Sequence, residues 1–274
     1  MKTLNDLRVR LSAALVFCLT TVLPASAKLP VTFAELRPGV VVLIASGDAK
    51  AGEVAGQLAA GGDNLVHVIA GSRTEEAAIK ARVAKAGLKG IVSVEELGLS
   101  PLPYRDHLIN SIVVMDLKQA QADGLKLKEA RRCLAPFGHL ASCKDGKLDQ
   151  VEEKPLPQEM DTWTHRYYGP DGIPVSQDKV FDLPLGFKWN AGLPMNFNNP
   201  ERAANRYSST RAMVVDDGRN FSFSTAVHEN LGEGWQSKYG TDQYLTCRDA
   251  FNGRLLWRKR IGSTYYGGLY IENL

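Results

Sequence analysis

Apolar runs alternate with polar, alanine-rich stretches through the first half of the chain. The apolar runs are short and continuous, as expected of strands that are buried on both faces. They occupy residues 40–45, 65–69, 91–94, 112–115 and 139–142. Helix-favouring stretches lie between them, at 49–60, 74–86 and 125–134. In the second helix, one alanine-rich side is expected to face the sheet, formed by Ala77, Ala78, Ala81 and Ala84. This order predicts an α/β, Rossmann-like domain with a parallel sheet covered by helices on both faces.

The pattern changes after residue 186 to short segments typical of antiparallel strands. The expected strands are residues 187–189, 211–215, 220–227, 244–248 and 255–261, and residues 264–271 open a further one. Asn252 and Gly253 predict a two-residue hairpin turn between the strands at 244–248 and 255–261, because both residues tolerate positive φ. The second half of the chain is therefore expected to be all-β.

The N-terminal 27 residues predict a secretory signal peptide. Basic residues come first, an apolar run follows at 11–23, and a small-residue cleavage site ends the segment at 25–27. The apolar run is too short to span a membrane. We expect cleavage before Lys28 and a periplasmic or secreted bacterial protein, with an uncleaved N-terminal anchor as the alternative.

The remaining boundaries follow from composition. Residues 28–143 are assigned to the α/β domain and residues 159–274 to the β domain. Residues 144–158 are charged and then proline-spaced, which predicts a stiff linker between the two domains.

Charge and cysteine content limit the classes of partner. The net charge is +3, and signal cleavage would remove three positive charges and one negative charge, leaving +1. That balance does not indicate a nucleic-acid or anionic-lipid surface, and no membrane span is expected after cleavage. Cys133, Cys143 and Cys247 would remain, which allows one disulfide at most, between Cys133 and Cys143 if they lie close together, or three buried thiols.

Two segments of the α/β region carry a family resemblance. In class I S-adenosylmethionine-dependent methyltransferases, a loop leads into the fourth strand, and Leu102-Pro103-Tyr104-Arg105-Asp106 resembles it. The run from Glu129 to Leu140 resembles the late helix, turn and strand of the same family. The first loop of that family is glycine-rich, whereas here it reads Ala45-Ser46-Gly47-Asp48-Ala49, which leaves Gly47 and Asp48 as vestigial cofactor positions. The resemblance also implies a ribose-binding acid after the second strand, where this chain has Ala70-Gly71-Ser72 and no carboxylate before Glu75.

A second resemblance covers the C-terminal half. The outer hairpin of a quinoprotein β-propeller blade has a residue pattern that is resembled here by Asp249-Ala250, Gly253 and Leu256-Trp257. Some propellers of this kind bind pyrroloquinoline quinone (PQQ). The segment from Met160 to Asp178 resembles one found in exported bacterial proteins that join a degenerate methyltransferase-like domain to such a β-propeller. A propeller needs several blades of roughly 40 residues, so we expect an incomplete propeller, about one blade with long loops, and a sequence that is a fragment.

Candidate ligand residues lie mainly outside the expected strands. Asp161 and His165 are either an acid/base pair or part of a ligand pocket. The alternative is a purely structural role, in which the neighbouring aromatic side chains fill the start of the first blade. Arg206, His228 and Glu229 lie in two long polar loops, at 190–210 and 228–242. Long loops in a compact β domain often carry function.

Three functions follow from these patterns. The first is an exported, non-catalytic binding scaffold with a vestigial methyltransferase-like domain and a PQQ-like propeller, acting on an unidentified protein or small molecule. The second is a periplasmic quinoprotein oxidoreductase that uses PQQ and calcium. The third is a methyltransferase, which the substitutions in the first loop disfavour. We expect the scaffold, without a resident cofactor or metal.

Overall fold

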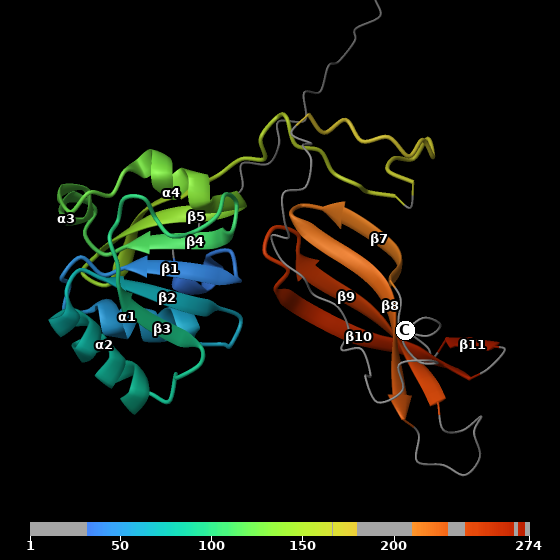
Figure 1. Cartoon of the computed structure of the whole chain (residues 1–274), viewed down its shortest axis with the longest axis horizontal. Helices are drawn as coiled ribbons and strands as arrows, with labels where there is room; N and C mark the ends of the chain where they lie inside the picture. The colour runs from blue at the N-terminus through green and yellow to red at the C-terminus, as the bar shows by residue number, and fades with distance from the viewer. Residues whose placement is uncertain (1–31, 166, 180–209, 230–238, 266–267, 272–274) are drawn as a thin grey trace, which may run out of the picture.

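The computed structural model describes residues 32–165, 167–179, 210–229, 239–265 and 268–271 (Figure 1). A six-stranded sheet forms the first part, in the order β3-β2-β1-β4-β5-β6. Its strands are β1 Val40–Ile44, β2 Leu65–Ala70, β3 Val92–Glu96, β4 Ile109–Val114, β5 Leu134–Lys144 and β6 Lys147–Glu153. The strands β1 to β5 are parallel, and β6 runs antiparallel to β5. The expected Rossmann-like α/β domain is confirmed at this level.

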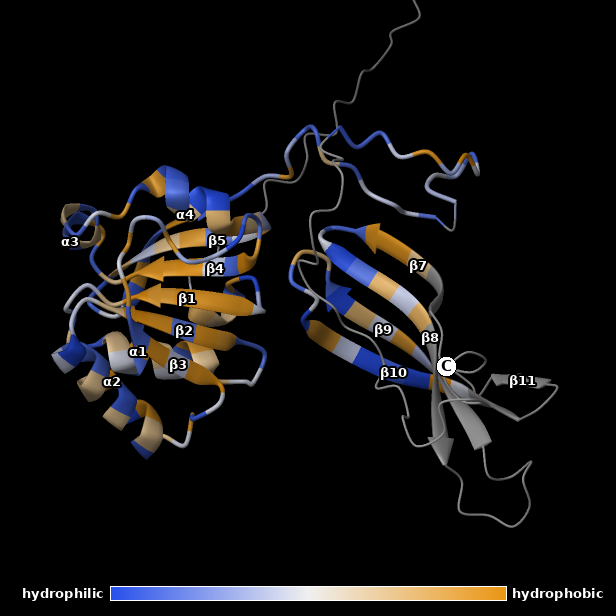
Figure 2. Ribbon diagram, viewed as in Figure 1, coloured by the Kyte–Doolittle hydropathy of each residue, from blue (hydrophilic) through white to orange (hydrophobic). Residues whose placement is uncertain are grey.

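Helices cover both faces of this sheet and separate two cores. The short 3-10 helix η1 Phe33–Glu35 and the helices α1 Ala51–Ala59, α2 Arg73–Lys85, α3 Leu117–Ala122 and α4 Leu127–Cys133 are the described helical elements. Val41 and Leu43 of β1 pack with α1 and α2, while Val42 and Ile44 pack with α3 and α4. Successive residues of a strand point to opposite faces. Both faces are therefore buried, which explains the continuous apolar runs seen in orange in Figure 2.

The buried side of α2 differs from the expected one. Ile79 and Val83, one helical turn apart, are its buried residues. The four alanines expected to face the sheet are exposed: Ala77, Ala78, Ala81 and Ala84. The two larger aliphatic side chains remove more apolar surface from water than alanine methyls, so they determine which side of the helix packs inward.

The predicted linker is partly wrong. Residues 147–153 form β6, which extends the first sheet and pairs with β5 from Lys144↔Lys147 to His139↔Glu153. Asp145 and Gly146 make the turn, with φ values of +55° and +78°. An Asp-Gly pair with positive φ at both positions is the favoured two-residue hairpin turn. The first sheet therefore continues past residue 143, where the boundary was predicted.

The C-terminal strands form one antiparallel sheet in the order β11-β10-β9-β8-β7. Their bounds are β7 Thr210–Asp216, β8 Arg219–Glu229, β9 Tyr239–Asp249, β10 Leu255–Tyr265 and β11 Gly268–Ile271. Asp217 and Gly218 make a tight turn between β7 and β8, both with positive φ. The described residues after position 209 show this one sheet, so the propeller stays a prediction. The expected strand at 187–189 lies outside the described residues.

The turn between β9 and β10 is longer than predicted. Five residues, 250–254, connect the two strands, and only Gly253 among them has a positive φ, at +73°. The Asp249 side chain holds this turn, because its Oδ1 accepts from the backbone N–H groups of Phe251 at 2.9 Å and Asn252 at 3.0 Å. An aspartate that bonds to backbone two residues ahead stabilises a turn without the paired positive φ values of a two-residue hairpin.

This turn docks on the first sheet at the amino ends of its parallel strands, as Figure 1 shows. Asn110, in β4, is fully buried and donates from Nδ2 to Asp249 Oδ2 at 2.6 Å. Asn110 Oδ1 accepts from the Val40 N–H at 2.8 Å and from Asn252 Nδ2 at 2.7 Å. Asn252 Nδ2 also donates to the carbonyl of Leu108 at 3.0 Å. A buried polar network with its partners satisfied fixes the two sheets in one arrangement.

No helix among the described residues is long and apolar enough to cross a membrane. The predicted signal peptide at 1–27 lies outside the described residues.

Candidate functional site

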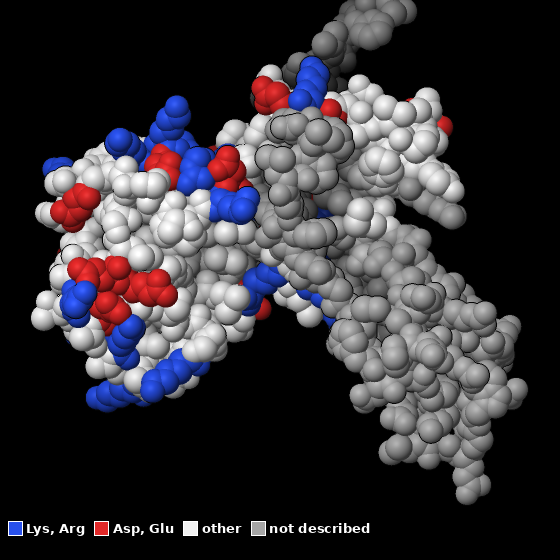
Figure 3. Space-filling model, viewed as in Figure 1, with Lys and Arg blue, Asp and Glu red and all other residues white. Residues whose placement is uncertain are grey.

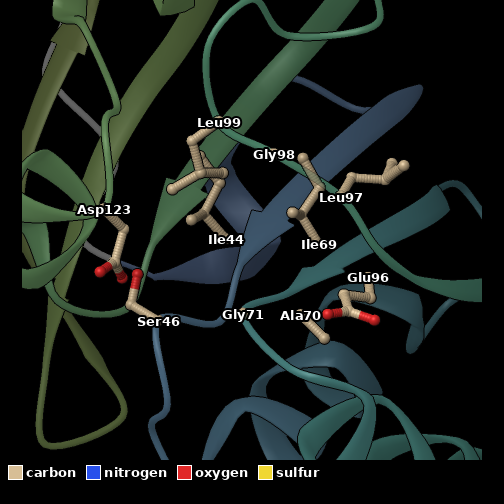
Figure 4. Close-up of a pocket in the computed structure, with 10 residues that line it drawn as sticks. All are labelled: Ile44, Ser46, Ile69, Ala70, Gly71, Glu96, Leu97, Gly98, Leu99 and Asp123. Atoms are coloured by element: carbon tan, nitrogen blue, oxygen red, sulfur yellow. The ribbon is translucent and has the colours of Figure 1, made fainter.

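A hollow lies at the carboxyl ends of β1, β2 and β3, on the opposite edge of the sheet from the docked turn (Figure 4). Its volume is about 480 Å³. Its lining residues are Ile44, Ser46, Ile69, Ala70, Gly71, Glu96, Leu97, Gly98, Leu99 and Asp123. Ligands of open α/β sheets bind in the crevice outside the carboxyl ends of the strands, so this hollow, here called the crevice, is the first place to look for chemistry.

The loop after β1 is built by its own side chains. Ser46 and Gly47 have φ values of +51° and +79°. Asp48 Oδ1 accepts from the Lys50 N–H at 2.7 Å, and its carbonyl accepts from the N–H of Ala51, where α1 begins. Of the two vestigial cofactor positions, Asp48 thus bonds within its own loop. The Ser46 hydroxyl is buried and has no hydrogen-bond partner within the described part of the chain.

The side chain of Glu75 joins the two loops that border the crevice. Its Oε1 accepts from the Gly47 N–H at 2.9 Å, and its Oε2 accepts from the Gly71 N–H at 2.7 Å. Ser72 is the N-cap of α2 and accepts from the Glu75 N–H at 3.2 Å. Ser72-Arg73-Thr74-Glu75 is therefore a Ser-x-x-Glu capping sequence whose glutamate reaches past the cap to a neighbouring loop. That spacing is the sequence signal that could have identified this role.

The fold suggests S-adenosylmethionine as a ligand of the crevice, but the residues present do not fit it. Both carboxylate oxygens of Glu75, the nearest acid after β2, are already bound to backbone N–H groups. Glu96, which lines the crevice, is paired with Arg73 at 3.3 Å. The Gly47 N–H, which belongs to the loop that would hold the cofactor, is bound to the protein's own carboxylate. Asp123, the other acid that lines the crevice, accepts from the Gln119 side-chain amide at 2.8 Å. Among the described residues, Glu75 and the two acids that line the crevice therefore all have partners.

Several charged side chains on the helices of the α/β part are paired with each other. Acidic and basic groups lie side by side on the face shown in Figure 3. On α2, Lys80 is bonded to Glu76, and hydrogen bonds from Lys80 lower the pKa of that carboxyl. On α4, Arg132 is bonded to Glu129 and lowers its pKa in the same way. Pairs that water reaches in part contribute little to stability, and the pairing leaves no one-signed surface at these positions.

Asp161 and His165 are not brought together as an acid/base pair. Asp161 Oδ2 accepts from the Tyr168 hydroxyl and from the Gln177 N–H, both at 2.6 Å, and the hydrogen bond from Tyr168 is the main cause of its lowered pKa. The His165 ring contacts the Thr164 hydroxyl at 2.9 Å. No hydrogen bond or ion pair between the two residues is found in the described ranges. Asp161 fastens the loop that contains it.

The neighbouring Trp163 pairs with the edge strand of the second sheet. Its backbone N–H donates to the carbonyl of Val215 in β7 at 2.9 Å, and its own carbonyl accepts from the Val215 N–H at 2.7 Å. The indole also makes an edge contact with the ring of Tyr168, with centroids 5.6 Å apart. The segment around Trp163 therefore covers part of an otherwise exposed strand edge.

The other predicted ligand residues remain untested. Arg206 lies outside the described residues. His228 and Glu229 are the last two residues of β8, and their side chains lie outside the description. Among the described residues, no group of three or more His, Cys, Asp or Glu side chains could hold a metal ion.

The three described cysteines are free and buried. Cys133 and Cys143 belong to the two different cores, on opposite faces of the sheet. The possible disulfide between them is therefore not formed, and the alternative of buried thiols is confirmed. Burial raises the pKa of Cys133 to about 11 and that of Cys143 to about 12, so both remain protonated thiols at neutral pH.

Comparisons with known proteins give a distant fold likeness. No family model matches the chain, and no curated protein matches its sequence. Solved structures do match, including a SAM-dependent methyltransferase from Aquifex aeolicus, at 17% identity over 45% of this chain and 66% of that one, with a TM-score of 0.30. The YcgJ protein from Bacillus subtilis matches at 17% identity over 40% and 45%, with a TM-score of 0.31.

A third match is the geranyl diphosphate C-methyltransferase from Streptomyces coelicolor A3(2), at 13% identity over 38% of this chain and 36% of that one, with a TM-score of 0.30. The chain thus spans less than half the length of most of these structures. The N-terminal region resembles the class I SAM-dependent methyltransferase fold distantly, and the comparisons extend no further than that.

Proposed function

We propose that this protein is an exported, non-catalytic binding scaffold whose α/β part is a platform for the C-terminal sheet. The observation that carries the proposal is the bridge made by Glu75. One carboxylate occupies N–H groups from both loops of the crevice, and the crevice therefore holds its shape without a cofactor.

The energetics favour this self-bound arrangement. A hydrogen bond to a charged group contributes about 1.5–3 kcal/mol, and less where water reaches it, as at the exposed Gly47 and Gly71. A cofactor that displaced Glu75 would have to replace two such bonds before any binding energy was gained. The methyl group of Ala45, which is fully buried, and the side chain of Ala49 add bulk where a glycine-rich loop would leave room.

The remaining parts of the proposal concern export and the partner. The residue pattern at 1–27 supports secretion to the periplasm or outside the cell. The meander β7-β8-β9-β10 has the strand order of a propeller blade, which supports a PQQ-like propeller as the binding part. N-terminal sequencing of the protein recovered from an export-competent host tests export and signal cleavage. We expect Lys28 as the first residue, and Met1 as the first residue would contradict the proposal.

Calorimetric titration of the full chain with S-adenosylmethionine tests the central claim. We expect no saturable binding up to millimolar ligand for the natural sequence. Micromolar binding would overturn the proposal. The variant Glu75→Ala tests whether the Glu75 side chain itself excludes the ligand. Binding gained by this variant shows that Glu75 blocks the crevice. The matched exposed change Glu53→Gln should leave the titration unchanged.

A further inference from the structure

A second hollow, here called the junction hollow, lies between the two sheets, beside the docked turn. Its volume is about 500 Å³, within the range of small-ligand sites. Arg37 and Arg254 line it from the loop before β1 and from the β9–β10 turn, and Arg219, Phe221 and Trp257 line it from β8 and β10. It lies on the opposite edge of the first sheet from the crevice and uses none of the same residues.

The side chains of three arginines line this hollow: Arg37, Arg219 and Arg254. Arg37 donates to the carbonyl of Asp217 at 2.6 Å, and Arg254 donates to the carbonyl of Gly62 at 3.1 Å. Arg219 approaches the Asp217 carboxylate only to 3.8 Å. Within the described ranges, no bidentate arginine–carboxylate pair forms here.

Carboxylates also lie near these arginines. Asp63 lines the hollow and its charge acts on Arg254, and Asp217 forms the long ion pair with Arg219. Asp249 also lines the hollow, but its oxygens are bound to the Asn110 amide and to two backbone N–H groups of the turn. Burial is the main cause of the lowered pKa of both Arg37 and Arg254, which shows that their charges are partly desolvated. Guanidinium groups in such surroundings bind carboxylate and phosphate groups well, because their planar donors match both oxygens.

Aromatic and aliphatic surface lies next to the guanidinium groups. The rings of Phe221 and Trp257 are in contact, with centroids 6.2 Å apart and planes tilted by 54°. Trp257 is 44% exposed and Leu255 is 42% exposed, although both line the hollow. An exposed indole beside a hollow offers a face on which a planar ring can stack.

We propose that the junction hollow binds a small organic anion, with a carboxylate or phosphate group held by Arg219 and Arg254 and a planar ring packed on Trp257. The two sheets together form the site, because Arg37 comes from the first part of the chain and the other arginines come from the second. The Asn110–Asp249 contact fixes the distance between them. This site is independent of the crevice, and its presence does not depend on whether the crevice binds a cofactor.

The first experiment titrates the full chain with phenyl phosphate, followed by calorimetry. We expect saturable binding with a submillimolar Kd. Inorganic phosphate and phenol, which each carry half of the recognised chemistry, should bind at least tenfold more weakly. Benzoate distinguishes the two anion classes, since a preference for it over phenyl phosphate assigns the site to carboxylates. Absence of saturation with both ring-bearing anions would overturn the proposal.

Variants locate the binding. Arg219→Gln is expected to raise the Kd at least tenfold, because the side chain is half exposed and its ion pair with Asp217 is long, at 3.8 Å. The matched control is Arg258→Gln. Arg258 follows Trp257 on β10 but lies over the ring of Tyr244, at 4.4 Å from its centroid, away from the hollow. Circular dichroism confirms that each variant is folded. Equal weakening by both variants would refute the location.

Discussion

The contact between Asn110 and Asp249 predicts a specific cost for an almost isosteric change, Asp249→Asn. The carboxylate accepts three N–H groups: two from its own turn and one from the Asn110 amide. An amide at position 249 offers one acceptor oxygen and one NH₂ group, which can only donate. If its oxygen stays on the turn, its NH₂ group faces the NH₂ group of Asn110. If Asn110 rotates to avoid this, its NH₂ group faces the Val40 N–H instead.

Either arrangement leaves one donor unpaired in a buried site, since Asn110 is fully buried and Asp249 is 1% exposed. Such a donor costs about 1–3 kcal/mol. We take about 2 kcal/mol as the expected loss in the free energy of unfolding. With a urea m-value of about 2 kcal/mol/M, this loss lowers the unfolding midpoint by about 1 M.

Two optical probes report on the two parts of the chain separately. The four tryptophans lie at positions 163, 189, 235 and 257, all after the first sheet, whereas α1 to α4 all lie before β6. Tryptophan fluorescence therefore follows the C-terminal part, and ellipticity at 222 nm follows the α/β part. We expect coincident transitions for the natural sequence. In the variant, the fluorescence transition should move about 1 M lower and precede the loss of ellipticity.

The control is Asp216→Asn, the same chemical change at an exposed residue of β7. It should leave both midpoints within about 0.25 M, the effect of a surface substitution of up to about 0.5 kcal/mol. An unchanged fluorescence midpoint for Asp249→Asn, or an equal shift for the control, would refute the reasoning that the buried carboxylate fixes the two sheets together.

Three further predictions concern the first sheet. Gly39→Ala would place a Cβ 2.0 Å from Asn110 Oδ1 at a φ of +138°, so we expect a loss of about 3 kcal/mol in urea unfolding, and a loss below 1 kcal/mol would contradict the close approach. Glu75→Gln turns one acceptor of the crevice bridge into a donor facing a backbone N–H, and its melting temperature at 222 nm should fall by a few degrees, for a cost of about 1 kcal/mol at this exposed position. Burial lowers the pKa of His67 and His139, so the unfolded chain binds more protons below about pH 6.5 and stability should decrease as the pH falls from 6.5 to 5. The double variant His67→Gln/His139→Asn should flatten that slope, and an unchanged slope would assign it to other groups.

The first sheet could be predicted because its strands are buried on both faces. In β1 every residue from Val41 to Ile44 is buried, so each of these positions is apolar and the strand is a continuous apolar run in the sequence. β6 gives no such run. It lies at the sheet edge with Leu148 and Val151 half-buried between charged residues, so its composition resembles that of a linker. The Asp145-Gly146 pair was the available signal for it.

The polar contacts that matter most could not be predicted in this way. Asn110 stands in an apolar strand, and its partner Asp249 is 139 residues away along the chain. Periodicity and composition describe local preferences, and they carry no information about such a pairing. Glu75 is the intermediate case. Its capping sequence is local and visible, but the bond to Gly47 depends on two loops meeting at the sheet edge.

The turn at Asp249 shows why a short motif can suggest more than it establishes. The turn itself accounts for these residues: the Asp249 side chain bonds to the backbone N–H groups of Phe251 and Asn252, and Gly253 adopts a positive φ. Those requirements apply to any antiparallel sheet with a five-residue turn of this kind, inside a propeller or outside one. What distinguishes this turn is that the second oxygen of Asp249 and the amide of Asn252 both bond to the α/β part. The resemblance to a quinoprotein hairpin therefore rests on residues whose roles here are to shape a turn and to dock it. The docking also creates the junction hollow, so the binding chemistry of this chain is to be sought where the two sheets meet.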